Sequence, residues 1–262
     1  MKIVFYGNCQ LNIGVYNIFK NYIDADYSII SSYDLIYNNL DIPINILKEA
    51  DIFIYQPINE KYGIYSINNN IVNSIMTYLN KNCNKICVPY LYFDSFFPLC
   101  KKNFDDGYDG GYLYKQNNIL NEESILNLKN IYSNLEIIDK YNNYDIDFNF
   151  KNRFDDNIKR LLDKEKLCNI KISDFILNNY KKIHLFEMHH HPTSILIIYL
   201  TQQIFNYLKI NIEIDKNIII NLSHEKFPIS KYVIDYFKFE FIEKEDINSF
   251  DYYLNLINII LK

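Results

Sequence analysis

The stretch that decides the fold reads Lys2-Ile3-Val4-Phe5-Tyr6-Gly7-Asn8-Cys9-Gln10, at the start of the sequence. Its apolar run, residues 2–6, predicts a short buried strand, and Gly7 permits a tight turn after it. Apolar residues then recur near helical spacing over residues 11–22, which predicts a helix. A strand, a turn and a helix in this order are typical of the first unit of a parallel sheet.

The same alternation continues through the first half of the chain. Residues 27–31, 51–55 and 85–88 predict three further strands, and residues 71–79 predict a helix between the last two. Strands that alternate with helices favour the α/β class, here with a parallel open sheet flanked by helices.

The second half predicts mainly helices. Their expected ranges are 121–138, 155–168, 172–182, 193–208 and 247–261, with a loop rich in Tyr, Asn and Asp over 141–150. We find no internal repeat and no linker-like stretch, so we predict a single α/β domain over residues 1–262 with a helix-rich second half.

Composition argues against two classes of partner. The net charge is −5 and the chain has only two arginines, Arg153 and Arg160, so it lacks the basic stripe that binds nucleic acid. Apolar runs such as 195–200 are far shorter than the roughly 20 residues of a membrane-spanning helix. Nothing at the start resembles a signal peptide, and we expect a soluble protein of the reducing cytoplasm.

The cysteines give no pattern of a disulfide framework or a metal site. There are five of them, an odd number without framework spacing. Cys83 and Cys87 lie four residues apart, but no second pair completes a zinc ribbon. We therefore expect no bound metal.

Cys9 is the first candidate for chemistry. It follows a strand and precedes a helix, and ligands bind at the carboxyl ends of the strands in open parallel sheets. The positive end of a helix lowers the pKa of a thiol, so we expect a reactive thiolate there. The alternative is that Cys9 is a small buried apolar residue, which is the commoner role of a free cysteine.

A run of histidines is the second candidate: Met188-His189-His190-His191-Pro192-Thr193. Pro192 suits the first turn of the helix that follows, which would leave His191 near its N-terminus as a general base. His189 and His191 could instead chelate a metal, but no acidic residue or cysteine nearby completes a site. Histidines with a structural role in a loop are the third possibility.

Gln56 closes the third predicted strand, and Tyr90, Phe93 and Asp94 follow the fourth. If the sheet is parallel, these residues lie at the same edge as Cys9, where they would line a pocket or simply form turns.

Together, these motifs resemble the WcbI family of polysaccharide-biosynthesis proteins, which are regarded as acetyl-CoA-dependent acetyltransferases. The similarity spans roughly residues 1 to 240 in consistent order. The matching stretches are Gly7-Asn8-Cys9-Gln10, Asp51-Ile52-Phe53-Ile54-Tyr55-Gln56-Pro57, Leu185-Phe186 leading to His191-Pro192-Thr193, and Phe227-Pro228-Ile229.

The resemblance implies a fold related to the SGNH hydrolases, with Cys9 at the position of their serine, and coenzyme A as cofactor. We expect Cys9 and His191 to be catalytic and six further residues of these motifs to bind the cofactor: Gly7, Asn8, Gln10, Gln56, His190 and Thr193. Charge alone makes four side chains candidates for the coenzyme phosphates: Lys101, Lys102, Lys159 and Arg160.

We therefore predict an O-acetyltransferase that acts on a sugar hydroxyl of a capsule or surface glycan. Cys9 could carry the acetyl group as a thioester, with His191 as the base. Alternatively, His191 could activate the sugar for direct attack, with backbone N–H groups of residues 7–10 stabilising the oxyanion. Two other functions stay open: a carbohydrate esterase of the SGNH type, and a glycan-binding module without catalysis.

Overall fold

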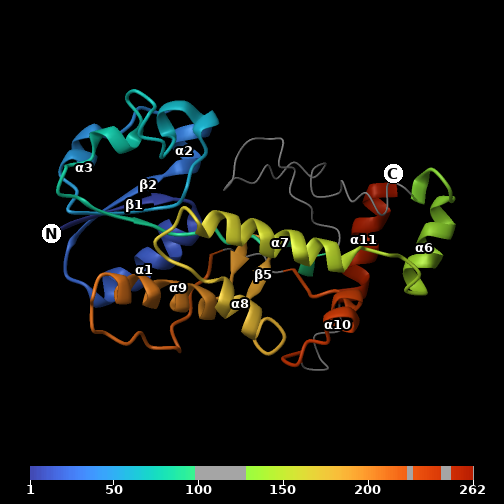
Figure 1. The fold of residues 1–262 in the computed structure, drawn as a ribbon. Coiled ribbons are helices and arrows are strands. Elements are labelled where there is room, and N and C mark those ends of the chain that lie inside the picture. The colour runs from blue at the N-terminus through green and yellow to red at the C-terminus, as the bar shows by residue number, and fades with distance from the viewer. Residues whose placement is uncertain (98–127, 223–226, 243–248, 262) are drawn as a thin grey trace.

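A parallel sheet forms the centre of the first half of the protein (Figure 1). The computed structural model describes residues 1–97, 128–222, 227–242 and 249–261. In these residues the strand order is β2-β1-β3-β4. The strands are β1 (Lys2–Gly7), β2 (Asp26–Ser31), β3 (Ile52–Tyr55) and β4 (Asn84–Cys87). All pairs are parallel, which confirms the four predicted strands and their arrangement.

Helices cover both faces of this sheet. Side chains of a strand point alternately to its two faces, and β1 is buried on both. Phe5 packs on the side of α1 (Tyr16–Tyr22) and α9 (Ser194–Tyr207), whereas Tyr6 packs on the side of α2 (Ser32–Tyr37) and α3 (Ile44–Lys48) (Figure 1). The predicted α/β class with a flanked parallel sheet is confirmed, and the relation to SGNH hydrolases stays a prediction.

The second half is rich in helices, as predicted. Besides α9 it contains α6 (Asn134–Asn142), α7 (Phe150–Glu165), α8 (Ser173–Asn179), α10 (Lys231–Phe237) and α11 (Ser249–Leu261). The apolar core of the α1 face continues from Ile3 to Leu261. No helix within the described ranges is long and apolar enough to cross a bilayer. The single domain over 1–262 stays a prediction.

Two predicted helices of the first half differ from the structure. Residues 71–79 form turns and a short 3-10 helix, η3 (Ile75–Tyr78), because Asn73 takes a left-handed backbone conformation (φ 60°) that interrupts any longer helix. The helix at 11–22 begins as one wide turn, the π-helix η1 (Gln10–Val15), and continues as α1. The helices α2 and α3 were not predicted.

Helix ends in the second half are decided by side chains. Of the predicted helix 121–138, residues 121–127 lie outside the described residues, and α6 starts only after Ser133, which forms a capping box with Glu136. The loop predicted at 141–150 is shorter, since α6 continues to Asn142 and α7 begins at Phe150 rather than at residue 155. Helix α10 was not predicted either.

Helix α7 ends at Glu165, whose carboxylate accepts hydrogen bonds from the N–H groups at the start of the next helix, α8. Glu165 accepts hydrogen bonds from the backbone N–H groups of Ile172 (2.6 Å) and Ser173 (2.8 Å) and from the Ser173 hydroxyl (2.6 Å). A carboxylate at the first N–H groups of a helix satisfies donors that have no partner within the helix. The predicted range 155–168 is therefore displaced toward the N-terminus.

Candidate functional site

Gln10 connects the three segments that meet at the carboxyl edge of the sheet. Its side chain is fully buried. The amide nitrogen donates to the carbonyl oxygens of Leu91 (2.6 Å) and His190 (2.8 Å), and the amide oxygen accepts from the backbone N–H of Leu91 (3.0 Å). Because a buried amide needs these partners, Gln10 fixes the turn after β1 to the segment after β4 and to the histidine run.

Gln56 completes this arrangement from the end of β3. Its amide oxygen accepts from the backbone N–H of Asn8 at 2.9 Å, and its amide nitrogen lies 3.5 Å from the amide oxygen of Gln10. A Cβ atom on Gly7 would lie 2.5 Å from the Gln56 amide oxygen, a distance that real Cβ contacts do not reach. Gly7 is therefore required for the approach of Gln56 as well as for the turn.

The three histidines lie in an antiparallel hairpin that was not predicted, formed by β5 (Phe186–Met188) and β6 (His191–Pro192). His189, His190 and His191 are all buried, and the ring centroids of His190 and His191 are 3.9 Å apart. The backbone N–H of Phe93 donates to the His189 carbonyl oxygen at 2.6 Å, which ties the turn to the segment after β4.

The placement of Pro192 in the first turn of the helix was wrong. Pro192 lies in β6, and Thr193 is the N-cap residue of α9. The Thr193 hydroxyl donates to the carbonyl oxygen of His184 at 2.9 Å and its N–H to that of Leu185 at 2.9 Å. These bonds to the segment before β5 hold Pro192 in an extended conformation, so Thr193 stabilises the hairpin.

Cys9 is half-buried at the start of η1, directly before Gln10. Burial raises the pKa of its thiol to about 11, and the backbone N–H groups of Gln10 and Cys9 offset this only in part. The expected lowering of the Cys9 pKa was therefore wrong. The Gln10 N–H is also used by the side-chain oxygen of Asn8 (3.0 Å), which reduces the positive potential at this turn.

Among the predicted site residues, hydrogen bonds thus bring together Asn8, Gln10, Gln56 and the backbone of His190, and Gly7 packs closely against Gln56. Cys9 and His191 are the sequence neighbours of this cluster. Phe227, from the last matching motif, also lies here, since its N–H donates to Glu187 (3.0 Å) and its ring stacks on His189 with centroids 6.0 Å apart.

Buried Asp94 is the centre of a polar network that the sequence did not reveal. Asp94 exchanges two hydrogen bonds with Asn157 of α7 (2.7 and 2.5 Å), and Arg160 lies 3.5 Å from its carboxylate. Arg153 donates to the carbonyl oxygens of Asp94 (2.9 Å) and Phe97 (3.1 Å). The signal in the sequence was that the chain's two arginines, seven residues apart, lie on the same face of α7. This network fixes the segment that also holds the His189 carbonyl.

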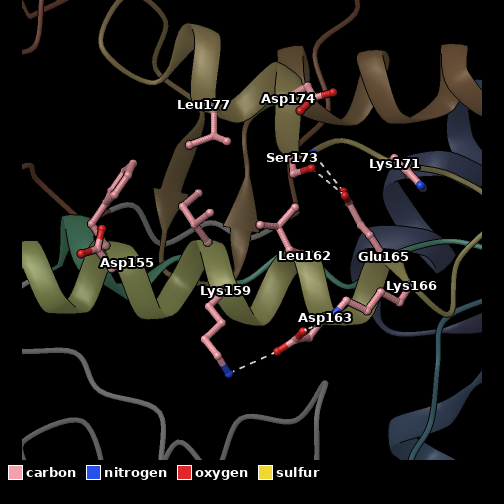
Figure 2. A pocket seen from close by; sticks show the side chains of 12 residues that line it. Asp155, Lys159, Leu162, Asp163, Glu165, Lys166, Lys171, Ser173, Asp174 and Leu177 are labelled. Carbon is pink, nitrogen blue, oxygen red and sulfur yellow. Dashed lines mark hydrogen bonds and ion pairs between the residues drawn. The ribbon is translucent and has the colours of Figure 1, made fainter.

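The candidate phosphate ligands lie in different places. Lys101 and Lys102 lie outside the described residues. Lys159 lines the groove between α7 and α8, and Figure 2 shows its side chain directed away from α8 toward Asp163, with which it pairs at 3.4 Å. Glu165, Ser173, Leu162 and other side chains of α7 and α8 line this groove.

Lys164 lies closer to the residues after β3 than to that groove. It lines a cleft of about 390 Å³ that begins at Pro57, directly after Gln56, and includes Asn59, Asn68 and Leu167. Arg160 and Lys164 also border a small hollow with Tyr90 and Tyr92, and the Lys164 ammonium lies 4.6 Å from the Tyr90 ring centroid. Sequence reasoning overlooked Lys164, because α7 contains several lysines and only the fold separates them.

Among the residues that the structure describes, no group of three or more His, Cys, Asp or Glu side chains could hold a metal ion. Cys83 belongs to the core on the α2 face of the sheet, whereas Cys87 lies at the end of β4. These two cysteines do not converge.

Comparison with known proteins supports the resemblance. A solved structure with 18% sequence identity covers 99% of this chain and 89% of its own with a TM-score of 0.62; it is described as native WcbI, a polysaccharide biosynthesis enzyme, without a disulfide bond between coenzyme A and one of its cysteines. No curated protein matches the chain by sequence. The family model of the polysaccharide biosynthesis enzyme WcbI matches residues 2–213, most of the chain, so the protein belongs to the WcbI family of polysaccharide biosynthesis enzymes.

Proposed function

We propose that this protein is an acetyl-CoA-dependent O-acetyltransferase that modifies a sugar hydroxyl in the biosynthesis of a capsule or another surface glycan. One observation carries the proposal: Gln10 holds the Cys9 turn against the backbone of the histidine hairpin at the carboxyl edge of the sheet. A thiol and imidazoles at the ligand-binding edge of an open sheet are suited to acyl transfer. The description of the related structure mentions coenzyme A together with one of that protein's cysteines, which supports this proposal.

The residues at this edge fit the parts of coenzyme A. The cleft beside Gln56 combines apolar side chains, Pro57 and Leu167, with amides, as the pantetheine arm requires. Lys164 lines that cleft, and Arg160 lies beside it at the hollow bordered by Tyr90 and Tyr92; these two cations would bind the phosphates. When bound, acetyl-CoA supplies an activated acetyl thioester.

The state of Cys9 constrains the chemistry. A thiol with a pKa of about 11 is almost fully protonated at neutral pH, so it needs a base before it can act as a nucleophile. His191, in the buried hairpin held by Gln10, would take that proton and later return it to the leaving group. In the alternative route His191 would take the proton of the sugar hydroxyl directly.

Backbone N–H groups of the Cys9 turn would stabilise the oxyanion in either route. Two of these donors already have partners, because the Asn8 N–H is bonded to Gln56 and the Gln10 N–H to the Asn8 side chain. The proposal therefore assigns this role to the N–H of Cys9 itself.

We also propose a cytoplasmic location. The four cysteines within the described residues are free thiols, as expected in a reducing compartment.

The decisive experiment is mass spectrometry of the purified protein with acetyl-CoA and a panel of sugars. We expect bound coenzyme by native mass spectrometry, an acetylated sugar as product, and loss of product in Cys9→Ala and His191→Asn but not in the control Cys83→Ala. Release of free acetate without an acetylated sugar would instead indicate an esterase. Absence of coenzyme binding at millimolar concentration would contradict the acetyltransferase and leave the glycan-binding module.

A further inference from the structure

Cys87 and Cys168 lie side by side although they are far apart in the sequence. Cys87 is the last residue of β4, and Cys168 follows α7 in the connection to α8. Their Sγ atoms are 3.5 Å apart across a sequence separation of 81 residues, and both thiols are free. The spacing of the cysteines in the sequence gives no hint of this pair.

The backbone around the two sulfurs is held in place by hydrogen bonds on both sides. The N–H of Cys87 donates to the side-chain oxygen of Asn169 at 2.8 Å. The carbonyl oxygen of Cys87 accepts from the N–H groups of Asn169 (2.9 Å) and Ile170 (3.3 Å). Residue 168 is therefore kept beside residue 87, and the sulfurs need to approach only from 3.5 Å to the roughly 2.05 Å of a disulfide bond.

We propose that Cys87 and Cys168 form a reversible oxidation site, a dithiol that peroxides convert to a disulfide. Cys168 is only partly buried whereas Cys87 is buried, so the peroxide reaches Cys168 first. The Cys168 sulfur attacks the peroxide, the O–O bond breaks, and a sulfenic acid and one water form. The Cys87 sulfur then displaces the hydroxyl of the sulfenic acid as a second water. Both sulfurs are oxidised, and both peroxide oxygens are reduced to water.

The other described cysteines lack such a partner thiol within contact distance. The Cys83 thiol has its nearest polar contact with the carbonyl oxygen of Asn84, 3.9 Å away, and Cys9 lies in the turn after β1. A sulfenic acid is overoxidised more readily where no second thiol is within reach, as at Cys83. Cys83 is therefore the matched control.

The disulfide would fasten the α7–α8 connection to the sheet. It closes a loop of about 80 residues, and closing a long loop restricts the unfolded chain and so stabilises the folded state. We expect the melting temperature of the oxidised protein to rise by at least about 5 °C. This inference is independent of the proposed acetyltransferase activity.

The test uses the reduced full-length protein, treated with a small excess of hydrogen peroxide at about pH 8.5, because contact with Cys87 and burial raise the pKa of the Cys168 thiol. Peptide mapping after alkylation should find the Cys87–Cys168 peptide as the main cross-link, and dithiothreitol should remove it. Cys83→Ser should keep the cross-link and the rise in melting temperature, and Cys168→Ser should lose both.

Two results would overturn the proposal. One is accumulation of sulfinic acid at Cys168 in the wild-type protein without a linked peptide. The other is a set of cross-links that mainly join other cysteines. Because both are read on the wild-type protein, neither depends on how well a variant folds.

Discussion

The side-chain amide of Gln10 donates to the carbonyl oxygen of His190 at 2.8 Å, across 180 residues of sequence. This bond joins the turn after the first strand to the histidine hairpin. The two segments belong to opposite halves of the chain. Because Gln10 is fully buried, each of its polar atoms depends on a protein partner.

We expect Gln10→Ala to destabilise the protein by about 2–4 kcal/mol, because it leaves the carbonyl oxygens of Leu91 and His190 and the Leu91 N–H without a partner. Urea denaturation measures this. Gln203→Ala on α9 is the control and should cost less than about 1 kcal/mol, since its side chain is only half-buried. Equal costs for the two variants would show that Gln10 does not hold the site together.

Gly7→Ala should cost about 2 kcal/mol, because the new Cβ would lie 2.5 Å from the Gln56 amide oxygen. Shortening the opposing side chain relieves this clash, so the double variant Gly7→Ala/Gln56→Ala should cost less than the sum of the single variants. A double-mutant cycle in urea measures the difference. Strictly additive costs would contradict the close approach of Gly7 and Gln56.

Alkylation of Cys9 should be slow at neutral pH. The thiolate is the reactive form, and burial raises the pKa of Cys9 to about 11, so the rate should increase about tenfold per pH unit between pH 7 and pH 10. Timed iodoacetamide labelling with peptide mapping reads the rate, and free cysteine is the reference. At pH 7 we expect Cys9 to react about 300-fold more slowly than the reference, since its thiolate fraction is lower by about that factor. Labelling of Cys9 as fast as free cysteine at pH 7 would show that a nearby group lowers its pKa after all.

Coenzyme A should raise the melting temperature. A ligand that binds only the folded state stabilises it by about 2.7 kcal/mol at a hundredfold excess over its Kd. Lys164→Ala, which removes a cation from the cleft beside Gln56, should weaken coenzyme binding about tenfold. Lys159→Ala is the matched control, because Lys159 lies in the groove between α7 and α8 and pairs with Asp163. If both variants weakened coenzyme binding equally, Lys164 would not be a phosphate ligand.

A chelator should leave the melting temperature and any transfer activity unchanged. The described residues contain no cluster of three potential ligands, and Glu187, the acidic residue next to the histidine run, completes no such cluster. Elemental analysis of the purified protein gives an independent reading. Zinc at one equivalent, together with activity that zinc restores after chelation, would disprove this prediction.

The strands and their order of appearance were readable from local patterns. Residues 2–6 form a strand, as a short apolar run that ends at a turn-forming Gly7 predicts. The helix predicted at 71–79 failed although its apolar residues recur near helical spacing, because Asn73, a residue type that readily adopts the left-handed backbone conformation, interrupts it.

The sequence by itself determined the α/β class, the parallel sheet and the positions of residues 7–10 and Gln56 at the ends of its strands, since these depend on periodicity and on the parallel arrangement of strands. Only the tertiary structure decided what those residues do to one another. The bond from Gln10 to His190, the contact of Cys87 with Cys168 and the raised pKa of Cys9 all depend on distance and burial. Neither quantity is encoded in local spacing, because both arise when segments far apart in the chain exclude water from the same place.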